Sequence, residues 1–231
     1  MSNYAKIIYP PDDDNSYPVL LAEYLFNRYM KKYTIKGNVP KILDIGCSRG
    51  SALKNFSKFG EIELHGIDRR DEKGQGYVFK ECDLENEKIP YPDNTFEIIY
   101  SKSVIEHVYN AENFLSESLR VLKPGGVFIV LTPDWESNYK TFFHDFTHVR
   151  PWTKKGLRDG LNIMGFKDGS AEYFYQLPFI WKYPRLIYIP KLIALLPDFL
   201  KWKTSEHRNT KDRKLIRFSK EIMLLASGSK Y

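Results

Sequence analysis

The stretch KILDIGCSRG, residues 41–50, carries the strongest fold signal in the chain. Its aliphatic residues are typical of a buried strand, and Gly46 and Gly50 then form a turn that leads into a helical stretch at 51–58. Glycine permits left-handed backbone and lets a ligand approach closely. Ligands of open α/β sheets bind beyond the carboxyl ends of the strands. The turn therefore predicts a nucleotide-like ligand held partly by unpaired main-chain N–H groups, with a purely structural turn as the alternative.

Strand-like and helical stretches alternate on both sides of this turn. Their pattern predicts an amphipathic helix at 17–33, strands at 61–70, 77–84, 96–104 and 127–133, and a helix at 110–122 that stops at KPGG. The run VFIVLTP is apolar almost throughout, as a parallel strand covered on both faces requires. The alternation predicts an α/β fold with a mostly parallel central sheet and helices on both faces.

The length of 231 residues fits a single domain, 1–231. Its pattern divides into a leading helix (17–33), a regular core (41–133), a looser region (134–178), an apolar and basic insert (179–216) and a closing strand (217–231). Cys47 and Cys82 lack the spacing of a disulfide framework, so free thiols in a reducing compartment are expected. With no leader or membrane-spanning stretch, a cytoplasmic protein is expected.

Three aspartates stand where successive strands of the core end. Asp44 lies two residues before Gly46, Asp68 closes the second strand, and Asp83 closes the third strand just before Leu84. The first can meet an ammonium group, the second can accept hydrogen bonds from ribose hydroxyls, and the third suits an adenine amine. Each alone is explained by a turn or cap, but three at successive strand ends favour one ligand site.

The motifs LDIGCSRG, GIDRR, ECDLE, DNTFEIIYSKSVIEHV and LKPGG resemble, in order and spacing, those of the class I S-adenosylmethionine-dependent methyltransferases. The resemblance covers residues 40–133 strongly and the closing EIMLLASG moderately. It implies a Rossmann-like, seven-stranded sheet whose last strand is antiparallel, a cofactor-binding core at 41–133 and an acceptor-side region at 134–178. Ser48 stands where many members have a middle glycine. A nicotinamide dehydrogenase, with G-x-G-x-x-G, fits less well.

The resemblance also assigns the cofactor, S-adenosyl-L-methionine, to particular residues. The methionine part would be wrapped by Asp44, Gly46, Cys47 and Gly50. The ribose would be held at Asp68, followed by Arg69, and the adenine flanked by Asp83 and Leu84. Ser101, at the end of the fourth strand, would line the floor of the pocket.

Histidines supply the candidate bases for the reaction. If the acceptor is a hydroxyl, a group must remove its proton, and histidine is suited to this near neutral pH. His107 follows the fourth strand, while HDFTH follows the fifth and carries His144, Asp145 and His148. The leading hypothesis is a base at His144 or His148 oriented by Asp145. Metal ligation by these three residues is the alternative, as is a structural role for His107.

The stretch HDFTHVRPWT resembles a signature of methyltransferases in polysaccharide and other glycan biosynthesis. This implies O-methylation of a small molecule or glycan, with a sugar hydroxyl as the expected acceptor. Methylation of a lipid or quinone head group is the alternative, followed by a non-catalytic cofactor-binding protein. Nucleic acid is not expected as a partner, because the fourth strand ends in YSKSV and no RNA-binding module is found.

The insert at 179–216 interleaves aromatic and aliphatic residues with lysines and arginines. From residue 179 onward the chain holds 12 Lys/Arg and 4 Asp/Glu, so the basic character of the protein lies in this part. A helical insert before the last strand is expected, and such a segment suits a helix that lies on an anionic membrane, at its inner face. A lid over the acceptor or a homodimer surface is favoured over membrane contact, because enzymes of the family often elaborate this region.

Overall fold

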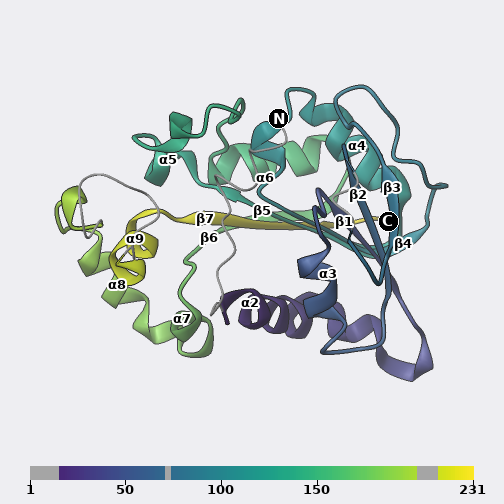
Figure 1. Cartoon of the computed structure of the whole chain (residues 1–231), viewed down its shortest axis with the longest axis horizontal. Coiled ribbons are helices and arrows are strands. Elements are labelled where there is room, and N and C mark those ends of the chain that lie inside the picture. Colours follow the sequence, from purple (N-terminus) through teal and green to yellow (C-terminus); the bar gives the residue numbers. More distant parts are fainter. Residues whose placement is uncertain (1–15, 71–73, 202–212) are drawn as a thin grey trace.

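The centre of the molecule is a seven-stranded sheet with the strand order β3-β2-β1-β4-β5-β7-β6 (Figure 1). The computed structural model describes residues 16–70, 74–201 and 213–231. The strands are β1 (Lys41–Ile45), β2 (Glu63–Asp68), β3 (Val78–Glu81), β4 (Phe96–Lys102), β5 (Leu122–Pro133), β6 (Lys167–Phe174) and β7 (Met223–Ser229).

The direction of the strands confirms the predicted fold. The pairs β1–β2, β2–β3, β1–β4 and β4–β5 are parallel, whereas β7 is antiparallel to both β5 and β6. Among the described strands, β7 alone runs against the others. The fold is therefore the Rossmann-like sheet with an antiparallel last strand that the motifs imply.

Helices cover both faces of the sheet (Figure 1). Helices α4 (Ala111–Val121) and α6 (Lys154–Ile163) pack on one face, and α2 (Tyr17–Leu25) and α3 (Ser51–Phe56) pack on the other. Side chains of a strand alternate between the two faces, so each central strand contributes to both cores. In β1, for example, Leu43 joins the α4 side and Ile42 joins the α2 side. Burial on both faces explains the continuous apolar runs of the sequence.

Capping side chains mark where two of the helices begin, whereas helical spacing in the sequence does not identify every buried residue of the leading helix. The side chain of Asn110 accepts from Asn113 N and begins α4, within the predicted helix at 110–122, and Thr153 accepts from Gly156 N and begins α6. The stretch 17–33 is α2 followed by a π turn (Phe26–Met30) and a 3-10 turn (Lys31–Tyr33). The wider π turn rotates the following residues, and Phe26 and Met30 are buried while Leu20 is exposed.

The insert is helical, as predicted. It contains α7 (Pro178–Lys182), a 3-10 turn (Pro184–Ile187), α8 (Tyr188–Ile193) and a second 3-10 turn (Asp198–Lys201), and residues 202–212 lie outside the described residues. Helix α9 (Lys214–Lys220) follows, so strand β7 begins at Met223, later than the predicted 217. Within the described part of the chain, no helix has the length and apolarity to cross a membrane.

Candidate active site

The turn after β1 closes on itself. Gly46 and Gly50 have φ values of +78° and +71°, and Ser48 between them also has a positive φ of 45°. The amides of Gly46 and Cys47 donate to Ile67 O at 2.8 and 3.1 Å, and that of Gly50 donates to Cys47 O at 2.8 Å. The prediction of unpaired N–H groups is therefore wrong at these three amides, because two of them fasten the turn to β2 and that of Gly50 closes the turn itself.

Tyr77, which sequence reasoning missed, explains why Gly50 cannot carry a side chain. Its hydroxyl donates to Ser48 O at 3.0 Å, and a Cβ at Gly50 would lie 2.2 Å from its ring. The left-handed φ of Gly50 and this close packing act together. Cys47 is buried beside the same ring, and burial raises the pKa of its thiol to about 12. Cys47 and Cys82 are both free thiols, as predicted.

The three aspartates lie at the carboxyl ends of three neighbouring strands, β1, β2 and β3. Asp44 is buried, and burial together with the negative charge of Asp68 raises its pKa well above the usual value. Asp68 Oδ2 accepts from Ser48 N at 3.0 Å, and its Oδ1 accepts from Arg69 N at 2.7 Å. Asp83 Oδ1 accepts from Glu85 N at 3.1 Å. Carboxylates are therefore arrayed along one edge of the sheet.

The remaining cofactor candidates form the boundary of this edge. Ser101 is fully buried and donates to Ile45 O at 3.0 Å, which closes the floor between β4 and β1. Leu84 is buried in the core, and its carbonyl accepts from Asn113 Nδ2 at 2.8 Å. Arg69 is exposed. Acidic groups beside a glycine turn and a closed floor fit a cationic amino-acid moiety and ribose hydroxyls, so these residues fit S-adenosylmethionine.

Beyond β4 the chain carries two further ionisable groups toward the next loop. Lys102 ends the strand, and burial lowers its pKa against the opposing effects of Glu106 and Asp44. Glu106 is 1% exposed, and burial raises its pKa to about 7. Its Oε2 accepts from Thr132 Oγ1 at 2.9 Å, whereas Oε1 has no hydrogen-bond partner among the described residues. Sequence reasoning missed Glu106, because a carboxyl next to a histidine is ordinary in a sequence.

The structure brings His107 and His148 together. His107 belongs to a 3-10 turn (Ile105–His107), His148 follows another (Phe142–His144), and their ring centroids are 4.7 Å apart. His148 Nδ1 lies 2.7 Å from Phe142 O. Because a carbonyl only accepts, Nδ1 of His148 carries a proton. Asp145 Oδ2 lies 3.9 Å from Nε2 of His148, so the expected contact between Asp145 and His148 is long.

Asp145 acts more directly on His107, through Thr147. The hydroxyl of Thr147 donates to Asp145 Oδ1 at 2.7 Å and lies 2.9 Å from His107 Nδ1. A hydroxyl that donates its single proton can only accept from the imidazole, so Nδ1 of His107 carries a proton and Nε2 bears the lone pair. Burial and His148 lower the pKa of His107, which keeps the ring neutral. Thr147 gave no signal in the sequence beyond its place in HDFTH.

Backbone contacts hold these two loops together across about forty residues. Glu106 O accepts from Val149 N at 2.9 Å and from Arg150 N at 3.0 Å, and Trp152 Nε1 donates to Ile105 O at 3.4 Å. The loop after β5 is thereby fixed on the loop after β4, and the position of His107 does not depend on a mobile segment.

His144 lies apart from this pair. Its side chain is exposed, and its backbone amide donates to Thr141 O at 3.0 Å. Four aromatic rings on the same loops are also exposed, each by more than half: Tyr109, Tyr139, Phe143 and Phe146. We refer to these four exposed side chains, which lie on the loops that carry the histidines, as the aromatic rim, and aromatic faces can stack on an acceptor.

A metal could be held by a different set of residues from the predicted one. Ligand atoms of Glu106, His107 and His148 lie within 4.8 Å of one another, whereas His144 and Asp145 do not belong to this group. Nitrogen and carboxylate ligands of this kind suit a divalent transition metal.

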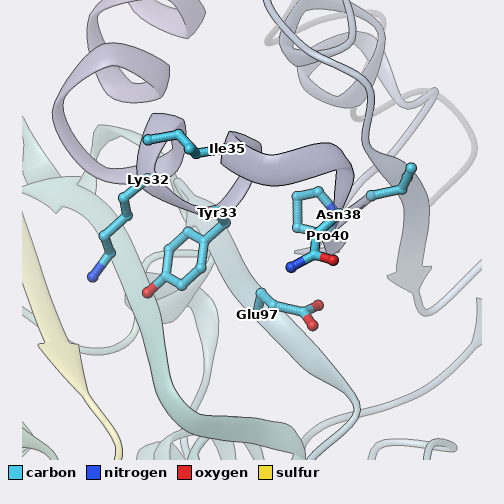
Figure 2. Close-up of a pocket in the computed structure, with 7 residues that line it drawn as sticks. Lys32, Tyr33, Ile35, Asn38, Pro40 and Glu97 are labelled. Atoms are coloured by element: carbon cyan, nitrogen blue, oxygen red, sulfur yellow. The ribbon is translucent and has the colours of Figure 1, made fainter.

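A cavity of about 640 Å³ lies elsewhere, at the opposite edge of the sheet. Figure 2 shows Lys32 and Tyr33 on one side of it and Asn38 and Glu97 on the other. Because Pro40 precedes β1 and Glu97 lies at the start of β4, this cavity faces the amino ends of the strands. It is therefore separate from the aspartates and the histidines.

Comparisons with known proteins agree with this geometry. Residues 43–130 match the family model described as a methyltransferase domain. The sterol 24-C-methyltransferase of Schizosaccharomyces pombe is 24% identical over 217 residues, which cover 82% of this chain and 57% of that protein. The ubiquinone/menaquinone biosynthesis C-methyltransferase of Stutzerimonas stutzeri is 32% identical over 124 residues, covering 46% of this chain and 48% of that protein.

Solved structures extend the likeness to almost the whole chain. A SAM-dependent methyltransferase from Archaeoglobus fulgidus superimposes with a TM-score of 0.61 at 19% identity, covering 92% of this chain and 94% of that chain. A phosphoethanolamine N-methyltransferase from Haemonchus contortus, in complex with S-adenosyl-L-methionine, has a TM-score of 0.57 at 14% identity and covers 95% of this chain and 61% of that chain.

The chain spans between about a quarter and three fifths of the length of the curated relatives it matches. The family model nevertheless covers the strands that carry Asp44, Asp68 and Ser101. The chain therefore carries a methyltransferase domain over residues 43–130 and has the fold of S-adenosylmethionine-dependent methyltransferases, and the match and the shared sheet together support a class I enzyme with S-adenosylmethionine as cofactor.

Proposed function

We propose that the protein transfers a methyl group from S-adenosylmethionine to an oxygen atom of a small molecule or glycan, with His107 as general base. The observation that carries this proposal is the chain of contacts from Asp145 through Thr147 to His107. It leaves a half-buried, neutral imidazole whose Nε2 bears the lone pair, next to the carboxyl ends of β4 and β5.

When bound, S-adenosylmethionine supplies the methyl group and a thioether leaving group. Asp44 and Asp68 bind and orient the cofactor at the ends of β1 and β2. His107 Nε2 takes the proton of the acceptor hydroxyl as the new carbon–oxygen bond forms and the carbon–sulfur bond breaks. The hydroxyl of Thr147, held by Asp145, stabilises the resulting imidazolium through Nδ1. In-line transfer of this kind depends chiefly on alignment, which the tethered loops provide.

The aromatic rim supports a sugar as the acceptor. Tyr109, Tyr139, Phe143 and Phe146 offer apolar faces with their edges in water, and a sugar ring presents both C–H surfaces and hydroxyls. Incubation with a panel of nucleotide sugars tests the proposal, with release of S-adenosylhomocysteine as the readout. Calorimetry with S-adenosylmethionine tests cofactor binding separately. Binding without turnover on any acceptor would favour a non-catalytic protein.

A lipid or quinone head group is the second candidate acceptor. It is favoured by the exposed apolar and basic side chains of the insert, and by the sterol and quinone in the names of two similar proteins. Lys140 on the acceptor side lies 3.0 Å from Asp198 of the insert, so the two regions are joined. Isoprenoid quinones and lipids with free hydroxyls belong in the same acceptor panel.

Removal of metal ions by a chelator distinguishes catalysis by a histidine base from catalysis by a metal held at Glu106, His107 and His148. With a histidine base, turnover is expected to be unchanged after dialysis against EDTA. A loss of turnover that Mn²⁺ or Zn²⁺ restores would assign the cluster to a metal and remove the base from the proposal.

A further inference from the structure

The insert exposes a row of large apolar side chains. Leu195 is 82% exposed, Phe199 is 73% exposed and Leu192 is 67% exposed, and Tyr188 and Leu196 accompany them. These residues come from α8 and the turn after it, at the end of the sheet where β6 and β7 meet α7 (Figure 1). A cluster of this kind on a surface marks a site of interaction.

The inner side of the same segment is firmly attached, so these side chains are held outward. Lys220 Nζ donates to Ala194 O at 2.7 Å and to Leu196 O at 2.6 Å, and it lies 3.1 Å from Asp198 Oδ1. Lys201 is buried and lies 3.3 Å from Glu221 Oε1. The apolar row is therefore held on the outside of the fold by contacts on its inner side.

The charge around this row is basic. Residues 178–201 and 213–221 contain eight lysines and arginines but only two acidic residues, Asp198 and Glu221. Both acids already have cationic partners, Asp198 in Lys140 and Lys220, and Glu221 in Lys201 and Arg217. The exposed basic residues of these ranges are Lys182, Arg185, Lys191, Arg213 and Lys214.

We propose that this surface, centred on Leu192, Leu195 and Phe199, docks on a lipid bilayer that contains anionic lipids. Aliphatic and aromatic side chains enter the interface while lysines and arginines reach the anionic head groups. A second copy of the chain fits less well, because a two-fold contact through this surface would bring the basic side chains of both copies together. Docking is peripheral, through the surface of α8 and its following turn.

Docking also gives the acceptor side an orientation. The ion pair between Lys140 and Asp198 joins the region of α5 (Trp135–Asn138) to the docked segment. The loop that carries His148 is thereby held on the side of the molecule that faces the lipid. The proposal itself does not depend on which acceptor is methylated.

Vesicle sedimentation with the full chain tests the docking. The protein is expected to pellet with vesicles of phosphatidylcholine mixed with phosphatidylglycerol, at least about tenfold more tightly than with phosphatidylcholine alone. Leu192→Ser combined with Leu195→Ser is expected to weaken this binding by about tenfold or more. Lys191→Gln is expected to weaken it by about fivefold, and less at high salt. Ile163→Ser is the matched control, since Ile163 is 82% exposed on α6, and it is expected to bind as the unchanged protein does.

Several results would overturn the proposal. These are the absence of binding to either vesicle, equal binding to both, or unchanged binding of the leucine variant. A dimer in analytical ultracentrifugation that Leu195→Asp dissociates, with no vesicle binding, would assign the surface to a second copy. Calorimetry with S-adenosylmethionine on every variant shows whether the fold is intact, so a failure of docking is distinguished from a failure of the proposed function.

Discussion

The cofactor edge and the acceptor side of this molecule are built in different ways. At the cofactor edge, Asp44, Asp68 and Asp83 are placed by strands that pair directly with one another. On the acceptor side, His107 and His148 are about forty residues apart and meet through contacts between loops, among them those of Glu106 O with the amides of Val149 and Arg150. Sheet pairing is a regular rule that a sequence pattern reveals, whereas contacts between loops are particular to each protein.

The largest expected effect tests the acceptor side. His107→Ala should lower turnover by about 10²–10⁴-fold, because the proton of the acceptor loses its base. Binding of S-adenosylmethionine should be unchanged, since His107 lies beyond the cofactor edge. S-adenosylhomocysteine release and calorimetry measure the two. His144→Ala is the control, because that side chain is exposed and apart from the pair. Equal losses in both variants would contradict the assignment.

The next effect tests the cofactor edge. Asp68→Ala should weaken binding of S-adenosylmethionine by about 100-fold, through lost hydrogen bonds to a charged acceptor and a loosened turn at Ser48. Isothermal titration calorimetry gives the affinity. Glu81→Ala is the matched control, because Glu81 is exposed and pairs with Asp68 in the adjacent strand. An unchanged affinity of Asp68→Ala for S-adenosylmethionine would show that the cofactor does not bind at this edge of the sheet.

A smaller effect sharpens the role of the loop contacts. Thr147→Val removes the hydroxyl between Asp145 and His107 and should lower turnover by about tenfold. In the unchanged protein the pKa of His107 lies below 6.5, so activity should be flat above that pH and fall below it. The variant should move this fall to lower pH, because the imidazolium loses a partner. Thr147→Ser should restore both the rate and the profile, and a structural role alone would leave the profile in place.

The smallest effect is on stability. The pKa of Glu106 is raised from 4.5 to about 7 in the folded protein, so its stabilising contribution is complete below pH 4.5 and is lost as the pH rises through about 7. Glu106→Gln should therefore raise the free energy of unfolding by ~1–3 kcal/mol above pH 7 and leave it nearly unchanged below pH 4.5. Urea denaturation at both pH values measures this. Glu112→Gln, on the exposed side of α4, should show no such pH dependence.

Much of the cofactor edge follows from the sequence. Parallel strands end at a common edge, so aspartates at three strand ends predict one site without any knowledge of the packing. The free thiols and the helix at 110–122 likewise followed from local patterns in the sequence. The unpaired amides at Gly46 and Gly50 were predicted wrongly, because their acceptors, Ile67 O and Cys47 O, depend on how the turn folds against β2.

The acceptor side could be predicted only in part. HDFTH gave a histidine and carboxylate cluster, but its partners in space are Glu106 and His107, while His144 points to solvent. Thr147 and Glu106 were missed because their roles come from hydrogen bonds across about forty residues. No periodicity in the sequence reports such contacts.

The amino-acid sequence by itself determined the sheet, the strand ends that carry the aspartates, and the basic and apolar character of the insert, because these follow from hydrophobic period, turn chemistry and composition. Only the tertiary structure decided which histidine receives the carboxylate's support, which amides of the turn are used, and that Leu192, Leu195 and Phe199 face outward. The physical reason is that backbone periodicity acts within a segment, whereas hydrogen bonds and burial between distant segments exist only once the whole chain has packed.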